Sequence, residues 1–319
     1  MKSKNSLNAN KPFRIPLIVL GSPTATGKTR LAVELAHACG GEIVNADSLQ
    51  VYRFMDIGTA KPTAEERKRV RHHLIDVVDP DEEFNAALYA DAARAAIARL
   101  HGEGKPVFVV GGTGLYIRAL LSGIIATPPV DAALRRHYQS LRDRFGRAHV
   151  YRLLCEKDPA AAARLNPNDS VRVIRALEVF DQSGQSIVVL QNRHAFTDCP
   201  YEALKIGLCV ERNELKQRIL DRTARMAEAG LAAEVQGLLD RGYGEKLKSM
   251  QSLGYKQMIA FLTGKRTMDE ALAEMNRETW RYAKRQMTWF AADKEILWHS
   301  PGQIDDIRRK VEDFWTRVR

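Results

Sequence analysis

The sequence predicts an α/β protein: a parallel β-sheet that carries a phosphate-binding loop (P-loop), has helices on both faces and is interrupted by a helical insertion domain. Three observations support this fold class. Short apolar runs alternate with helical patterns through the first 125 residues. A loop of the P-loop type follows the first apolar run. The stretch from about 128 to 200 is rich in Ala and Arg and contains no clear strand.

The expected elements follow from the hydrophobic spacing. The run IPLIVLG predicts a buried strand at 15–21, and apolar residues at helical spacing predict a helix at 28–39 that ends at Gly40-Gly41. Further strands are expected at 42–46, 106–111, 203–210 and 294–299, and the apolar HLIDVV at 73–78 belongs to the same series. Further helices are expected at 86–101, 213–229, 231–241, 267–292 and the C-terminus.

These elements suggest four parts. Residues 1–12 form a polar tail that we expect to be disordered, and 13–127 form the first part of the P-loop core. Residues 128–200 form the helical insertion, and 201–319 supply the rest of the core and the C-terminal helices.

The composition excludes several classes of protein. The chain has 319 residues, of which 45% are hydrophobic and 28% charged, as in ordinary globular proteins. The N-terminal tail lacks the apolar core of a secretion signal, and no apolar run approaches membrane-spanning length. The four cysteines show no metal-binding spacing. We therefore expect a cytoplasmic protein that does not bind or span a membrane. The net charge of +10 is compatible with a nucleic-acid partner but does not establish one.

The segment SPTATGKT at 22–29 resembles the P-loop pattern G-x-x-x-x-G-K-[ST]. Gly27, Lys28 and Thr29 match its second half, whereas Ser22 stands in place of the first glycine. A loop of this kind between a strand and a helix points its backbone N–H groups and its lysine toward a bound anion. The hydroxyl of the threonine that follows the lysine can bind Mg²⁺. The alternative is an ordinary turn between a strand and a helix.

Asp47 follows the second strand and is expected at the same sheet edge as the P-loop. It could bind Mg²⁺, orient a substrate or accept a proton, or it and Ser48 could merely cap a turn. The third core strand ends in Gly111-Gly112-Thr113-Gly114 rather than in the acidic residue common in ATP-hydrolysing P-loop enzymes. Thr113 could hydrogen-bond an anion or a base, although glycine clusters also form plain turns.

Other clusters admit both structural and functional interpretations. His72 and His73 are adjacent on a strand and point to opposite faces, which favours hydrogen bonding over a metal site. Arg172 and Arg175 lie one turn apart, beside an apolar face that we assign to Val171, Ile174, Leu177 and Val179. They could contact phosphates or form a solvated surface. The segment ETWRYAKRQMTWF interleaves aromatic and basic residues, which suits either RNA stacking or core packing.

Taken together, these segments resemble the tRNA dimethylallyltransferase family over about residues 15–290. The resemblance depends on seven ordered blocks: SPTATGKT, NADSLQVYRFMDIGTAKP, HHLIDVVDP, FVVGGTGLYIRALLSG, NPNDSVRVIRALEVF, SLGYKQM and YAKRQMTWF. It implies transfer of a dimethylallyl group from dimethylallyl diphosphate to the exocyclic amine of the adenine 3′ of a tRNA anticodon, with Mg²⁺.

The resemblance also implies roles for residues. Catalysis would depend on Asp47 as general base, Thr113 and Lys28, with Thr29 near Mg²⁺. The diphosphate, at a loop of a kind routinely labelled as an ATP site, would contact Ser22, Pro23, Thr24, Ala25, Thr26, Gly27, Lys28 and Thr29. The tRNA anticodon stem-loop would contact Asp47, Ser48, Leu49, Gln50, Thr113, Arg135, Val171, Arg172, Val173, Ile174 and Arg175. We expect a monomer.

The sequence departs from the family pattern at several positions. Phe54 stands where glycine is common, Ser170-Val171 replaces Pro-Gln, Trp280-Arg281 replaces Arg-Gln, and Ala291 replaces Arg. Three other functions fit parts of the sequence: an isopentenyltransferase acting on free adenylate, a P-loop nucleotide kinase, and an RNA-binding nucleotide switch. The basic helical insertion favours a large RNA acceptor over the first. The Asp47 block and GGTGLY are not explained by the other two.

Overall fold

A computed structural model describes residues 14–125, 127–194 and 200–318. The tail predicted at 1–12 lies outside these residues. The described chain divides into a core unit, residues 14–121 and 200–318, and a helical unit, residues 122–194. The insertion expected at 128–200 falls on this helical unit, which begins several residues earlier.

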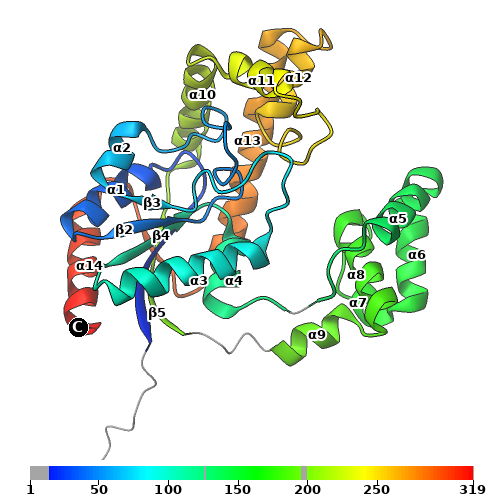
Figure 1. Ribbon diagram of the computed structural model, residues 1–319, viewed down its shortest axis with the longest axis horizontal. Helices are drawn as coiled ribbons and strands as arrows, with labels where there is room; N and C mark the ends of the chain where they lie inside the picture. Colours follow the sequence, from blue (N-terminus) through cyan, green and yellow to red (C-terminus); the bar gives the residue numbers. More distant parts are fainter. Residues whose placement is uncertain (1–13, 126, 195–199, 319) are drawn as a thin grey trace, which may run out of the picture. The chain divides into compact units, whose positions relative to one another are not determined.

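The core unit contains one parallel sheet, as the sequence predicts (Figure 1). Its strand order is β3-β2-β4-β1-β5-β6, and every recorded strand pairing is parallel. The strands are β1 (Ile15–Gly21), β2 (Glu42–Asn45), β3 (His72–His73), β4 (Val107–Gly111), β5 (Tyr201–Leu208) and β6 (Leu297–His299). Since β1 pairs with both β4 and β5, the strand that leads into the P-loop lies in the interior of the sheet.

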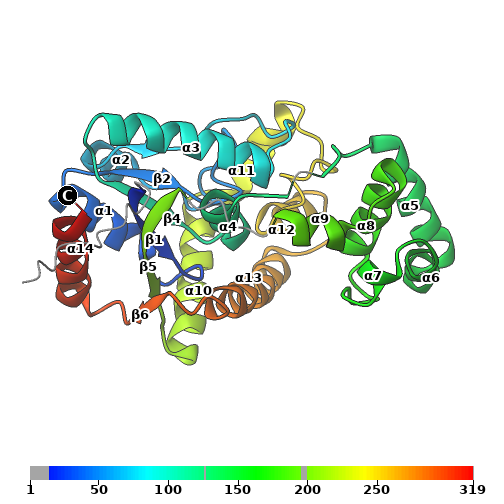
Figure 2. The same cartoon turned by 90° about the horizontal axis from the view of Figure 1, so that it is seen from below.

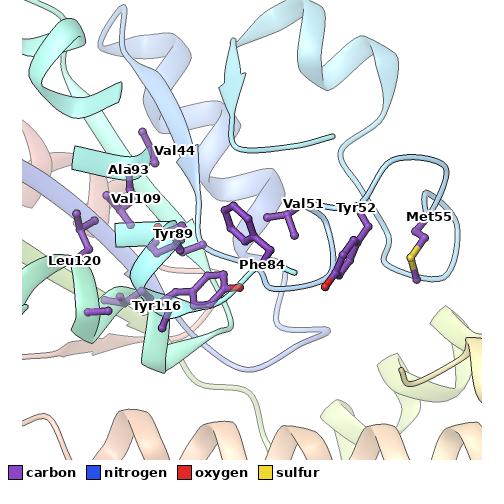
Figure 3. Packing of buried hydrophobic residues seen from close by; sticks show 14 of the residues in the cluster. Val44, Val51, Tyr52, Met55, Phe84, Tyr89, Ala93, Val109, Tyr116 and Leu120 are labelled. Atoms are coloured by element: carbon purple, nitrogen blue, oxygen red, sulfur yellow. The ribbon is translucent and has the colours of Figure 1, made fainter. Parts of the chain in front are cut away.

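Alternation along the buried strands explains why helices cover both faces. Leu17 and Val19 pack with α3 (Ala86–Gly102) and α4 (Gly114–Ser122), whereas Ile18 and Leu20 pack with α1 (Lys28–Ala38) and α14 (Ile304–Val318). Figure 3 shows part of the first cluster, in which the rings of Tyr89 and Tyr116 stack with centroids 4.3 Å apart. The predicted fold class is therefore confirmed.

The remaining helices of the core unit surround the carboxyl edge of the sheet (Figure 2). They are α2 (Ala64–Arg69), α10 (Arg212–Glu228), α11 (Leu231–Asp240), α12 (Tyr255–Leu262) and α13 (Met268–Ala291). Thr267 and Glu270 form a capping box at the start of α13, which satisfies backbone N–H groups of its first turn. No helix among the described residues is long and apolar enough to cross a bilayer.

The apolar segment at 73–78 is not a regular strand. Regular pairing with β2 ends at His73, and a single isolated bridge joins Val78 to Tyr52. Between them, Leu74 and Asp76 adopt left-handed backbone conformations with φ of 61° and 57°. Asp76 instead accepts hydrogen bonds from Lys61 at 2.5 Å and from Arg67 at 2.9 Å. Here side-chain ion pairing overrides the apolar pattern.

The helical unit consists of α5 (Ala132–Phe145), α6 (Arg147–Lys157), α7 (Pro159–Ala162), α8 (Ser170–Ser183) and α9 (Ile187–His194). Its core includes Val173, Ile174 and Leu177 from α8. Val171, which we assigned to the apolar face, is instead 76% exposed. The buried stripe follows 173, 174, 176 and 177, so Val171 lies on the opposite side of the helix.

Candidate active site

The P-loop connects β1 to α1 and is closed by its own side chains. Ser22 is buried, and its hydroxyl lies 2.9 Å from Thr26 Oγ1, which donates to the Pro23 carbonyl at 2.9 Å. These bonds hold the turn where the usual first glycine is missing. Ala25 and Gly27 have φ of 63° and 92°, so the loop curls immediately before α1.

Charge is concentrated at the start of α1. Burial lowers the pKa of Lys28 to about 8; the Asp47 carboxylate opposes this shift, whereas the nearby Arg222 guanidinium adds to it. Burial likewise lowers the pKa of Arg222, again against the effect of Asp47. Lys28 and Arg222 are therefore two poorly solvated basic groups beside the helix N-terminus. An incoming polyanion would stabilise their protonated, positively charged forms.

Asp47 is held at the carboxyl edge of the sheet by close packing of two loops. Its Oδ1 accepts a hydrogen bond from the Leu49 N–H at 2.9 Å, so Asp47 also performs the turn-capping role considered from the sequence. Thr113 meets the same loop: its N–H donates to Ala46 O at 3.1 Å, and its Oγ1 accepts from the Ser48 N–H at 3.0 Å. A Cβ on Gly111 would lie 2.0 Å from Ala46 O, so glycine is required for this approach.

Helix α13 links the P-loop to the loop after β4. The buried Gln286 accepts from the Thr24 N–H at 2.9 Å and donates to Gly112 O at 2.8 Å. Tyr282 forms side-chain hydrogen bonds with Thr113 and Gln286. Burial and the Asp47 charge raise the pKa of Tyr282, and these two hydrogen bonds partly oppose that shift. The aromatic and basic pattern around Tyr282 predicts either core packing or RNA stacking, and no sequence signal identifies Gln286 or Arg222 as site residues.

A cavity of about 340 Å³ opens between these groups. Of the predicted site residues, it is lined by Thr24, Lys28, Thr29, Asp47, Ser48, Leu49 and Gln50. Arg222, Tyr282 and Gln286 line it as well, whereas Thr113 lies behind Ser48. A second cavity of about 820 Å³ shares Lys28, Thr29 and Arg222 with the first and adds Arg67 and Arg225. One cation-lined region therefore borders both cavities.

The residues that could hold Mg²⁺ are few. Within the described residues no group of three or more His, Cys, Asp or Glu side chains is arranged to bind a metal. The Thr29 hydroxyl and the Asp47 carboxylate line the same cavity. Since Mg²⁺ commonly binds through substrate phosphates, waters and one or two protein oxygens, these residues fit an ion that arrives with a phosphorylated ligand.

The histidine pair has structural partners. His72 Nδ1 lies 2.8 Å from Val70 O, and His73 Nε2 lies 2.6 Å from a Glu42 carboxylate oxygen. His72 also lines the 340 Å³ cavity.

The tRNA-contact residues predicted in the helical unit fall into three groups: exposed, buried and paired with a buried carboxylate. Arg172 is exposed and lies 3.4 Å from the Asp169 carboxylate. Val173 and Ile174 are buried in the unit's core, so their side chains cannot reach a partner.

Arg135 and Arg175 converge on the fully buried Glu178. Arg135 donates to its two carboxylate oxygens at 2.6 and 2.8 Å, and Arg175 donates at 3.1 Å. Arg175 also donates to Thr127 and to the Pro128 carbonyl. These arginines therefore stabilise the helical unit, and a contact with RNA would be an additional role.

Comparison with known proteins gives consistent results. Residues 50–293 match the family model described as IPP transferase. The chain is 55% identical to tRNA dimethylallyltransferase 2 of Syntrophus aciditrophicus (strain SB) over 93% of this chain and 96% of that protein. It is 50% identical to tRNA dimethylallyltransferase of Geobacter metallireducens (strain ATCC 53774 / DSM 7210 / GS-15), with 94% and 97% covered.

Two crystal structures are similar over most of the chain. A full-length tRNA isopentenylpyrophosphate transferase from Bacillus halodurans is 38% identical with a TM-score of 0.70, and covers 96% of this chain and 98% of its own. A eukaryotic dimethylallyltransferase acting on tRNA is 28% identical with a TM-score of 0.78, with 95% and 80% covered.

Proposed function

We propose, for a chain that belongs to the IPP transferase family of tRNA dimethylallyltransferases, that the 340 Å³ cavity is its active site. In this cavity the dimethylallyl group of dimethylallyl diphosphate would be transferred to an adenine of tRNA. The enzyme transfers a dimethylallyl group to tRNA. The finer proposal is that the acceptor is the exocyclic amine of the adenine 3′ of the anticodon. The observation that carries the proposed transfer is that the phosphate-binding loop, the cationic Lys28 and Arg222 and the Asp47 carboxylate line a single cavity.

The donor's diphosphate fits against the P-loop. Its negative charge would be stabilised by the N–H groups at the start of α1, by the Lys28 ammonium and by the Arg222 guanidinium. This charge grows as the allylic C–O bond breaks, so the same contacts stabilise the transition state. A Mg²⁺ ion held by Thr29 and the phosphates would neutralise part of the diphosphate charge, which leaves the Asp47 carboxylate free to act as a base.

The acceptor fits on the Asp47 side of the cavity. As the new C–N bond forms, the adenine amine becomes a better acid, and its proton passes to the Asp47 carboxylate. Ser48 and Gln50 line the same wall and can hydrogen-bond the edge of the base. Thr113 holds Ser48 in place through two hydrogen bonds, so its role is to position this wall. The base must leave its stack to enter, at a cost of a few kcal/mol.

RNA binding would depend on basic side chains in each of the two units. In the helical unit, exposed Arg172 on α8 can pair with phosphates. In the core unit, Lys256 and Arg285 line the 340 Å³ cavity and can contact the acceptor strand. We propose that the anticodon stem-loop of tRNA is the partner and that the enzyme acts as a monomer.

The test is incubation of the full chain with radiolabelled dimethylallyl diphosphate and Mg²⁺, with unmodified tRNA, AMP or ATP in parallel. We expect label in tRNA, at the adenine 3′ of the anticodon after nuclease digestion. Label in AMP would identify an adenylate isopentenyltransferase instead. Absence of label from all three acceptors, with phosphoryl transfer from ATP, would identify a kinase.

A further inference from the structure

The loop between β2 and α2, residues 46–63 (the β2–α2 loop), lines the cavity with both of its ends. Asp47, Ser48, Leu49 and Gln50 come from its first part, and Gly58, Thr59, Ala60 and Pro62 come from its second part. The Gln50 amide joins the two by donating to Thr59 O at 3.2 Å and to Ala60 O at 3.1 Å. The position of the second part therefore affects the part that carries Asp47.

A single carboxylate from another element holds the second part. Glu234 on α11 accepts hydrogen bonds from three successive backbone N–H groups, those of Asp56 at 2.9 Å, Ile57 at 2.7 Å and Gly58 at 3.1 Å. It also accepts a hydrogen bond from the Tyr255 hydroxyl at 2.6 Å. Four donors to one carboxylate, three of them backbone, form a bound-anion arrangement in which a side chain takes the place of the ion.

The ring of Tyr255 makes the fit tight. Tyr255 is fully buried at the start of α12, and a Cβ on Gly58 would lie 2.5 Å from its ring. Burial and the adjacent Glu234 carboxylate raise the pKa of Tyr255, so its hydroxyl keeps the proton that it donates. The Glu234 carboxylate is therefore held on one side by a rigid donor and on the other by the β2–α2 loop.

The β2–α2 loop is stiff enough to transmit a displacement. Val51, Tyr52 and Met55 are buried in the sheet's core cluster, and Figure 3 shows Val51 next to Phe84 with Tyr52 and Met55 farther along the loop. Buried Lys61 donates to Tyr52 O at 2.6 Å and to the Asp56 and Asp76 carboxylates at 2.7 and 2.5 Å. Such cross-links keep the loop a single piece. Moving residues 56–58 would therefore move the wall that faces the acceptor.

We propose that Glu234 is a positioning residue that holds the β2–α2 loop, and with it Asp47 and Gln50, in the arrangement that binds and activates the acceptor. This inference rests on the proposed function. The P-loop is braced separately, through Ser22 and Gln286. Loss of Glu234 should thus impair the acceptor side of the reaction and leave donor binding intact.

The test compares four full-length proteins: wild type, Glu234→Gln, Tyr255→Phe and Asp240→Asn. Glutamine offers one acceptor oxygen and turns an NH₂ group toward backbone donors. Tyr255→Phe removes one of the four bonds. Asp240→Asn removes a charge from the exposed end of the same helix and is the control. For each protein, kcat, both KM values, the thermal midpoint and the hydrogen exchange of residues 50–62 are measured.

For Glu234→Gln we expect kcat to fall by roughly 10- to 100-fold, because small misplacements of catalytic groups cost that much. The KM for tRNA should rise, the KM for dimethylallyl diphosphate should stay within about two-fold, and the amides of 56–58 should exchange faster. Tyr255→Phe should show the same pattern more weakly, and Asp240→Asn should match wild type.

Three results would overturn the proposal: an unchanged kcat per folded molecule, an equal rise in both KM values, or unchanged exchange at 56–58. A wild type without transferase activity would refute the proposed function instead. In that case the exchange measurement still decides whether Glu234 holds the loop.

Discussion

The low pKa of Lys28 predicts how donor binding depends on pH. Burial lowers this pKa to about 8, against the Asp47 charge and with help from Arg222. A diphosphate in the P-loop stabilises the protonated ammonium, so binding takes up a proton and only the protonated enzyme binds tightly. The protonated fraction falls from about 0.9 at about pH 7 to about 0.1 at about pH 9, so the apparent Kd should rise roughly ten-fold.

The assay is calorimetric titration of the full chain with dimethylallyl diphosphate and Mg²⁺, without tRNA, in two buffers of different protonation enthalpy. At about pH 8, close to half a proton should be taken up per donor bound. The Lys28→Arg variant keeps the charge but does not titrate in this range. Its pH profile therefore reports only the ligand's own ionisation. If both proteins show the same profile, or wild type takes up no proton, the electrostatic account of the donor site is wrong.

Three substitutions test other parts of the site. Asp47→Asn should slow single-turnover transfer by roughly 10²–10⁴-fold, which is the usual contribution of a general base to the rate. The affinity for tRNA, measured by filter binding, should stay near that of wild type. Undiminished turnover would exclude the base role. Arg172→Ala should reduce the slope of log tRNA affinity against log salt concentration by about 1, without changing the thermal midpoint. Arg175→Ala should reduce this salt slope as well, and should also lower the thermal midpoint because Glu178 loses a partner. Unchanged salt slopes in both would remove α8 from the RNA contacts. Gly111→Ala places a Cβ 2.0 Å from the carbonyl oxygen that precedes Asp47, so activity should fall by roughly 100-fold, and an active variant would show that this close approach is dispensable.

The sheet was predictable because its signals are local. Buried strands such as β1 and β4 are short apolar runs next to glycines, and the order of strands and helices implies parallel pairing. β5 lies at Tyr201–Leu208, two residues before the predicted range. The sequence did not reveal α2 or α12, which are short and close to turns.

The site was only partly predictable, because its parts lie far apart in sequence. Lys28 and Asp47 follow strands, so the carboxyl-edge rule places them together. Arg222 and Gln286 come from long helices, where a basic or amide side chain looks like any surface residue. No local pattern predicts which of these will face a cavity.

Phe54 shows how structure explains an unusual residue. Its φ of 65° is the left-handed conformation, which glycine adopts without strain. The Arg241 guanidinium lies 4.4 Å from the Phe54 ring centroid, and the Tyr243 ring stacks at 6.4 Å. These contacts offset the backbone strain at a place where the resemblance leads us to expect glycine.

The Gln286 bridge has a consequence for how the enzyme is made. Its partners, Thr24 and Gly112, leave the ribosome long before it, and the strand β5 that completes the centre of the sheet is also synthesised late. A nascent chain therefore carries its phosphate-binding loop for most of translation without the amide that fixes it. The donor site, with its loop fixed between Thr24 and Gly112, is therefore complete only after α13 has been synthesised.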